Sequence, residues 1–366
     1  MRTTDLTPLP ERPSLEQYKK QAKDLLKLAR AGNSEALSRV ERHGVTPLNT
    51  ALAGAQFTIA REHGFETWPK FAAHVHQLAR LNSPVSNFEA AADAIVAGDL
   101  VKLTALVSKY PELVHARSTR AHQATLLHYI GANGVEDYRQ KTPLNAVTLA
   151  TVLLKAGAEV DAVAKMYSED TALGLVATSV HPKRAGVQLA LMELLLSHGA
   201  AIDGLAPQRS ILIAALHNGR KEAAEFLAGR GAHLDLEGAS GVGRLDIVES
   251  FFDPGAGLKA NATNTQMELG FIWACEYGRN NVVEFLLDRG IDPFAQQNTG
   301  LTGLHWAIVG AQPKTVKLLL QRGASLEARN RYGGTPLGQA LWCKSNNDDV
   351  DYMPIIEMLI QAGGCE

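Results

Sequence analysis

Five polar side chains between residues 129 and 217 have the chemistry for acid–base catalysis or for binding a small molecule. They are Tyr129, Asn133, Glu136, His181 and His217. Histidine and carboxylate groups can transfer protons, while tyrosine and asparagine can hold a polar ligand by hydrogen bonds. No established nucleophile–base or acid–base pair is evident among them. Tyr129, Glu136, His181 and His217 are therefore candidate catalytic residues only if the protein is an enzyme.

The sequence lacks the motifs that identify several common enzyme classes. It contains no GxSxG, GxxxxGK[ST] or HExxH motif. The glycines of GASGVGRLDIV (238–248) lie in a helical pattern rather than in a turn from strand to helix, so they do not predict a dinucleotide site. The segment NNDDVD (346–351) lacks the glycine and the distal glutamate of a calcium loop. We expect no metal and no cofactor.

Composition limits the possible partners and compartments. Lys and Arg number 36 against 38 for Asp and Glu, so the charge gives no general attraction to nucleic acid or to an anionic membrane. No apolar run approaches the length of a bilayer span, and the N-terminal residues lack the apolar core of a signal peptide. Three cysteines without CxxC spacing favour a reducing compartment. We expect a cytoplasmic protein that is a monomer rather than an obligate oligomer.

The elements that position these side chains are repeated along the chain. LTGLHWAIVG (301–310) has relatives in TLLHYIGANG (125–134), FIWACEYGRN (271–280) and TPLGQALWCK (335–344). Each is followed by an apolar segment such as EFLLDRGIDPF (284–294). The pattern predicts pairs of short helices that stack on their neighbours, because neither helix of a pair can bury its apolar stripe alone.

The motifs TGLHWA…LLLQRGA and TPLGQA…MLIQAGG resemble the ankyrin repeat over about residues 86–366. The resemblance implies an all-α solenoid of about eight units, whose concave face binds partners. It also implies that His128 and His305 tie neighbouring turns together by hydrogen bonds to the backbone. The chain further resembles a group of bacterial ankyrin-repeat proteins, through ARxxGFxxW (60–68) and GLVATSVHPxRAGVQ (174–188). That second resemblance implies nothing about chemistry.

The spacing of the repeats predicts an irregular part, residues 86–255, and a regular part, residues 265–366. Insertions at 135–148 and 180–188 lengthen the link between the paired helices of two consecutive units. The unit around 238–252 is short enough to have lost its hairpin. Insertions in repeat proteins lie in loops along one edge, which is frequently the binding edge.

Residues 1–85 contain no ankyrin-like motif and predict a helical N-terminal extension. We expect helices over 14–32, 34–42, about 49–63 and 68–80, with Ser14 and Thr67 as N-caps. The extension would cover the end of the solenoid, since an exposed terminal repeat needs a polar cover. A separate docking module joined through SPVSN (83–87) is the alternative.

Aligning the repeats places aromatic and polar residues at equivalent positions on the first helix of each unit. Trp273 and Trp306 lie five residues before the end of their helices, and Trp342 lies two before the corresponding mark in the last unit. Tryptophan and tyrosine are enriched at interfaces. The equivalent positions give the candidate binding residues Trp273, Glu276, Tyr277, Trp306, Trp342, Asn133, His217 and Asn218. Packing between neighbouring units is the alternative role of the tryptophans.

Two functions follow from these observations. The first is a binding or scaffold protein that holds a protein segment along the concave face, and needs no catalytic residue. The second is an enzyme or a small-molecule-binding protein with a cleft shaped by the insertions 135–148 and 180–188. Under the first, we expect that replacing Trp273 and Trp306 together by alanine weakens binding without unfolding the chain.

Overall fold

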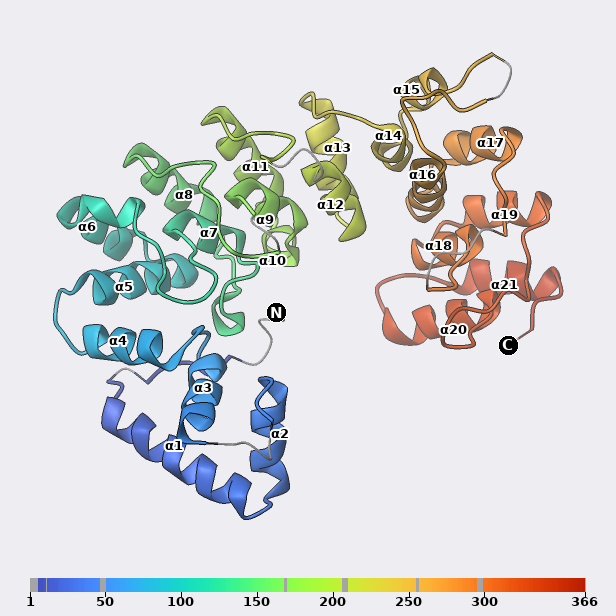
Figure 1. Cartoon of the computed structure of the whole chain (residues 1–366). Coiled ribbons are helices and arrows are strands. Elements are labelled where there is room, and N and C mark those ends of the chain that lie inside the picture. Colours follow the sequence, from blue (N-terminus) through green and yellow to red (C-terminus); the bar gives the residue numbers. More distant parts are fainter. Residues whose placement is uncertain are drawn as a thin grey trace. The chain divides into compact units, whose positions relative to one another are not determined.

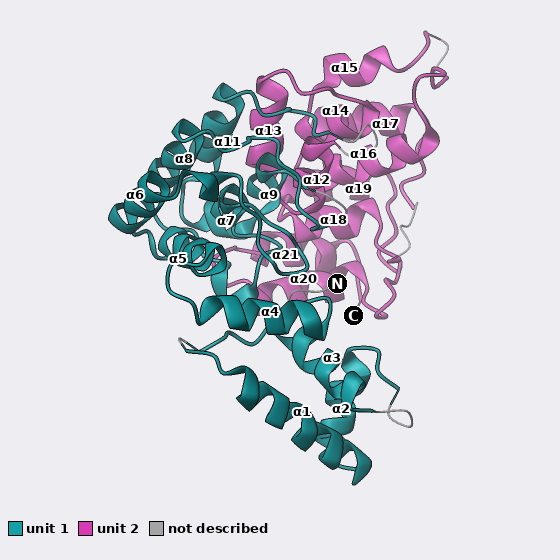
Figure 2. Ribbon diagram, turned by 60° about the vertical axis from the view of Figure 1, so that its left-hand side comes forward, with its two compact units in different colours: residues 1–207 teal, residues 208–366 magenta. Residues whose placement is uncertain are grey.

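The computed structural model describes residues 6–10, 12–46, 51–167, 170–205, 210–254, 257–294 and 299–365. Within these ranges the protein is all-α, with two isolated β-bridges, Ala164 to Asp170 and Phe252 to Leu258. The chain forms two compact units, residues 1–207 and 208–366 (Figure 2). Among the described residues, no helix has the length and apolar character needed to cross a bilayer.

The first unit begins with four helices that share a core of their own. Tyr18, Leu25, Ile59 and Phe71 are among its buried residues. The N-caps expected at Ser14 and Thr67 accept hydrogen bonds from the backbone three residues later. These helices are α1 (Leu15–Arg30), α2 (Ser34–Arg42), α3 (Leu52–Glu62) and α4 (Trp68–Leu78), close to the expected ranges. Residues 47–50, where the third was expected to begin, lie outside the described ranges.

The rest of the first unit consists of stacked helix pairs (Figure 1). The pairs are α5 (Pro84–Ala97) with α6 (Leu100–Lys109), α7 (Leu126–Gly131) with α8 (Ala146–Lys155), and α9 (Ala172–Thr178) with α11 (Gln188–Ser197). Two 3₁₀ helices, η2 (Pro111–Val114) and η3 (Asp137–Arg139), and the short α10 (Val180–Arg184) lie in the connections. The insertions predicted at 135–148 and 180–188 thus fall between the paired helices, where η3 and α10 form.

The second unit contains five helix pairs in sequence. They are α12 (Ile211–His217) with α13 (Lys221–Gly229), α14 (Leu236–Val242) with α15 (Leu245–Ser250), α16 (Asn264–Glu276) with α17 (Asn280–Asp288), α18 (Gly303–Val309) with α19 (Pro313–Gln321), and α20 (Pro336–Asn346) with α21 (Met353–Gln361). The first helices α14, α16, α18 and α20 pack side by side in that order, and so do the second helices α15, α17, α19 and α21. The connection from α13 to α14 consists only of residues 230–235, whereas the connection from α17 to α18 runs from 289 to 302. The short connection has no room for a hairpin loop, which agrees with the loss of a hairpin expected for the unit around 238–252.

Local sequence signals explain where these helices begin and how closely they approach. Thr302 and Thr335 cap α18 and α20. Gly323, past the end of α19, has φ +83, a conformation that favours glycine. Gly310 has an ordinary φ, but a Cβ atom there would lie 1.8 Å from the carbonyl oxygen of Glu276, so glycine is required for α18 to approach α16.

The two motif histidines join neighbouring repeats, as the resemblance implied. Nδ1 of His305 accepts a hydrogen bond from the backbone N–H of Thr302 at 3.3 Å, and Nε2 lies 3.4 Å from the carbonyl oxygen of Gly334 in the next repeat. His128 makes the same contacts, with Thr125 and with the carbonyl oxygen of Asp170. Burial lowers the pKa of His128 to about 4, which keeps its ring neutral at physiological pH. Both histidines are therefore structural residues.

Candidate functional site

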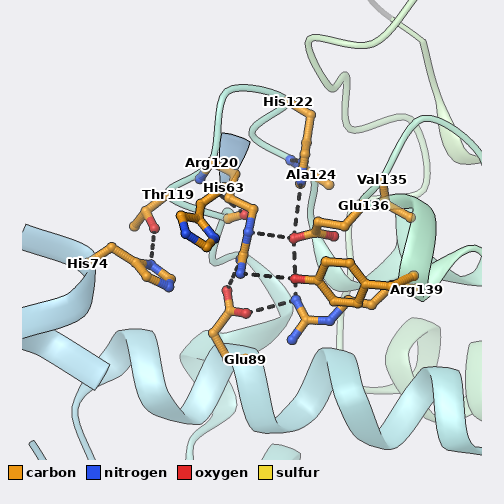
Figure 3. A network of polar contacts seen from close by, with 12 residues as sticks. His63, His74, Glu89, Thr119, Arg120, His122, Ala124, Val135, Glu136 and Arg139 are labelled. Carbon is orange, nitrogen blue, oxygen red and sulfur yellow. Dashed lines mark hydrogen bonds and ion pairs between the residues drawn. The ribbon is translucent and has the colours of Figure 1, made fainter. Parts of the chain in front are cut away.

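A buried ionic cluster fixes the first insertion to the body of the first unit (Figure 3). We define it as Glu89 of α5, Arg120 of the segment before α7, Glu136 and Arg139. Arg120 Nε lies 2.7 Å from Oε1 of Glu136, and the Arg120 Nη1 group donates to Glu89. Arg139 Nη1 donates to Oε2 of Glu89 at 2.7 Å and to Oε1 of Glu136 at 3.3 Å. Each arginine thus bridges both carboxylates.

The electrostatics of the ionic cluster identify it as an ion-pair network rather than a proton-transfer site. Burial would raise the pKa of Glu136, but the charges of Arg120, His122 and Arg139 outweigh burial and hold this pKa below its ordinary value. Glu89 behaves in the same way beside the two arginines. Both carboxylates are therefore ionised at neutral pH, and neither is poised as a general acid.

Tyr129 and Glu136 are the two catalytic candidates that the structure brings into contact. The Tyr129 hydroxyl donates to Oε1 of Glu136 at 3.4 Å. Both residues are completely buried, and burial raises the pKa of Tyr129 well above its ordinary value. In this conformation a substrate cannot reach either group, so their contact serves packing.

The remaining candidates of the small-molecule hypothesis lie elsewhere. Asn133 donates to the Thr178 hydroxyl at 3.2 Å and accepts from the Tyr167 hydroxyl at 3.0 Å, which links three segments of the first unit. His181 is the second residue of α10, and its backbone N–H donates to Oγ of Ser179. His217 ends α12 and belongs to the second unit.

Aromatic side chains contact one another across the first helices of the second unit. The Trp273 ring lies 5.9 Å from the Trp306 ring in an edge-to-face arrangement, 6.4 Å from Tyr277 and 4.6 Å from His217. Such ring pairs stabilise beyond the area they bury. We call His217, Trp273, Tyr277 and Trp306 the aromatic cluster.

The polar groups of Trp273 and Tyr277 have partners inside the unit. Trp273 Nε1 donates to Oε1 of Glu237 at 2.8 Å, and the same oxygen lies 3.1 Å from Nε2 of His217. The Tyr277 hydroxyl donates to the carbonyl oxygen of Leu216. Trp273 and Tyr277 are only 5% and 8% exposed. They hold neighbouring repeats together, and we expect alanine at position 273 to cost stability.

Two atoms beside these rings lack partners. Nε1 of Trp306 and Oε2 of Glu276 are buried and make no hydrogen bond to any described residue. Burial raises the pKa of Glu276 to about 7, against smaller opposing effects of His217 and of a hydrogen bond with Tyr277. An unpaired buried polar group is costly, and these two are among several such atoms in the described part of the chain.

The other two binding candidates are exposed. Trp342 on α20 is 62% exposed, and it packs less against the unit than any other aromatic residue on these first helices. Asn218, just after α12, is also exposed, and its amide donates to the carbonyl oxygen of Ala214.

Comparison with known proteins identifies the repeats of the second unit. A family model of ankyrin repeats in three copies matches residues 236–330 and again 271–364. Residues 236–364 of the chain are ankyrin repeats. The matched residues hold the pairs from α14 to α21, which include Trp273, Trp306 and Trp342.

Several known proteins resemble parts of this chain. The E3 ubiquitin-protein ligase hecd-1 of Caenorhabditis elegans is 36% identical over 77 residues, which are 21% of this chain and 3% of the ligase. The putative ankyrin repeat protein L92 of Acanthamoeba polyphaga mimivirus is 35% identical over 74 residues, 20% of this chain and 18% of the viral protein. The chain thus spans less than a fifth of either relative.

Two solved structures are also similar. The ankyrin repeat domain of human ASB11 is 21% identical with a TM-score of 0.40, covering 75% of this chain and 98% of that domain. The ankyrin repeat domain of Bcl-3 is 20% identical with a TM-score of 0.33, covering 68% of this chain and 92% of that domain.

Sequence reasoning about this ankyrin-repeat protein missed Glu89, Arg120 and Glu237. Glu89 offered one signal, because it stands among alanines on the inner face of its helix, in FEAAADAIV (88–96). A charged residue on an apolar face predicts a buried partner of opposite charge. Nothing in the sequence named that partner, since Arg120 and Arg139 lie 31 and 50 residues away.

Proposed function

We propose that this ankyrin-repeat protein binds a segment of another protein across the first helices of its second unit. The observation that carries the proposal is the unfilled hydrogen-bonding capacity of Trp306 on α18, a helix that contacts α20, which bears the exposed Trp342. The indole N–H of Trp306 is a donor without an acceptor, and Glu276 has an acceptor oxygen without a donor. A peptide backbone supplies both kinds of group, which favours a protein segment as the ligand.

The packing of the helices supports the same surface. The helices α16, α18 and α20 lie in successive contact (Figure 1). Tryptophan dominates the energetics of many protein interfaces, where a few side chains contribute most of the affinity. Trp342 and the partly buried Trp306 are the two side chains available for that role.

The small-molecule alternative receives less support. Tyr129 and Glu136 are inaccessible, and His217 belongs to the second unit. We therefore propose no catalytic role for Tyr129, Glu136, His181 or His217. The first insertion serves the first unit through the ionic cluster, which anchors residues 136–139 to α5.

The test is a selection of short random peptides, displayed on phage, against the full chain. Affinities of the selected peptides are then measured by fluorescence anisotropy for the wild type, Trp342→Ala and Ile360→Ala. Ile360 is a matched control, because it is an apolar residue of the same repeat, 57% exposed on the second helix α21. We expect Trp342→Ala to weaken binding about tenfold or more and Ile360→Ala to leave it unchanged. Equal affinities for both variants, or a selection that yields no peptide, would contradict the proposal.

A further inference from the structure

The carboxylate of Glu276 restricts which side chain of a bound segment can lie beside it. Its Oε2 atom is buried and unpaired, whereas the neighbouring Glu237 already accepts from Trp273 and contacts His217. Two carboxylates therefore stand beside the aromatic cluster. The imidazole of His217, when it is protonated, is a cation in direct contact with Glu237.

Arg279 is a nearby cation of the second unit that is committed to other partners. Arg279 follows Glu276 closely in sequence, but its Nε donates to the carbonyl oxygen of Gly241 and its Nη2 pairs with Glu225. The raised pKa of Glu276 agrees with this arrangement, because burial outweighs every opposing interaction at that carboxyl.

The rings around Glu276 favour the same kind of ligand. The face of a tryptophan or tyrosine ring attracts a cation within about 6 Å of its centre. Trp306 contacts Trp273, which contacts Tyr277, and α18 meets α16 so closely that Gly310 abuts the backbone of Glu276. The aromatic rings of Trp273 and Trp306 and the residue Glu276 thus lie on two helices, α16 and α18, that pack closely against each other.

We propose that the bound segment places a lysine or arginine side chain at the junction of α16 and α18, with its cation against Glu276 and the Trp306 ring. The proposal rests on the proposed function and specifies its ligand. An acidic side chain would face two carboxylates, and an apolar one would place no positive charge opposite them. A carbonyl group of the segment accepts the hydrogen bond from Nε1 of Trp306.

The experiment combines a change in the protein with a change in the ligand. Peptides selected on the full chain are sequenced, and the conserved basic residue of the tightest is replaced, arginine by citrulline or lysine by norleucine. Both peptides are titrated into the wild type, Glu276→Gln and the control Glu268→Gln. Glu268 is an exposed residue of the same helix, so the control makes the same chemical change away from the junction.

We expect the selected peptides to be enriched in lysine and arginine relative to the unselected library. Loss of the peptide's charge should weaken binding about tenfold or more to the wild type and to Glu268→Gln, but less than about threefold to Glu276→Gln. Peptides without basic residues, or an equal loss for all three proteins, would overturn the inference. If those peptides still depend on Trp342, the proposed function stands without it. A selection that yields no peptide would remove both.

Discussion

Replacing Arg139 by methionine should open the first unit locally. The side chain is 7% exposed, and its guanidinium contacts Glu89 at 2.7 Å and Glu136 at 3.3 Å. Methionine retains much of the apolar stem but leaves two buried carboxylates to share one arginine, Arg120, where they had two. Removing one partner of a buried ion pair costs about 3–5 kcal/mol, a large fraction of the 5–15 kcal/mol that stabilises an ordinary domain.

Hydrogen–deuterium exchange with mass spectrometry measures this cost where it arises. Each 1.4 kcal/mol changes an opening equilibrium by about tenfold, so amides of α5 and α7 should exchange about 100-fold faster or more in Arg139→Met. Arg39→Met is the control, because Arg39 also pairs with a glutamate, Glu62, at 2.8 Å, but its side chain is 39% exposed. We expect this control to lose less than about 1 kcal/mol of stability. If both variants accelerate exchange of α5 and α7 equally, the ionic cluster does not anchor the insertion.

Three further predictions concern the second unit. The pKa of Glu276 is about 7 in the folded state, against an ordinary value of 4.5. Between pH 4.5 and 7 the unfolded chain therefore ionises this carboxyl more readily than the folded chain does. The wild type should lose up to about 3 kcal/mol of stability relative to Glu276→Gln over that range. Urea unfolding across that range measures the difference, and a constant difference would contradict the raised pKa. His305→Ala should lower the free energy of unfolding by about 2 kcal/mol at pH 7, because it removes the contact of the ring with the carbonyl oxygen of Gly334. A midpoint of urea unfolding equal to that of the wild type would show that this contact does not stabilise the protein. Trp342→Ala should leave the melting temperature within about 1 °C of the wild type, because the side chain is exposed, and a large drop would show that it packs in the core.

The sequence predicted the parts of this fold that depend on local signals. Helix ranges followed from apolar spacing and from caps such as Ser14 and Thr67, and the contacts of His128 and His305 followed from the repeat motif. These features repeat or lie within a few residues of one another. A single sequence is therefore enough to locate them.

The features that the sequence left open depend on contacts between distant residues. Trp273 and Trp306 occupy equivalent positions, yet only Trp273 has a hydrogen-bond partner, because the repeat before it supplies Glu237. The ionic cluster likewise joins α5 to an insertion whose path no motif encodes. Position in a repeat thus does not predict which of the equivalent residues are buried or paired.

The most direct test of the central claim is the position of a bound peptide. The photoreactive residue p-benzoylphenylalanine is incorporated at position 342 on α20 or, as a control, at position 360 on α21, and each protein is irradiated with a selected peptide. The proposed surface predicts a covalent peptide adduct from position 342 and none from position 360. An adduct from position 360 without one from position 342 would contradict binding across the first helices.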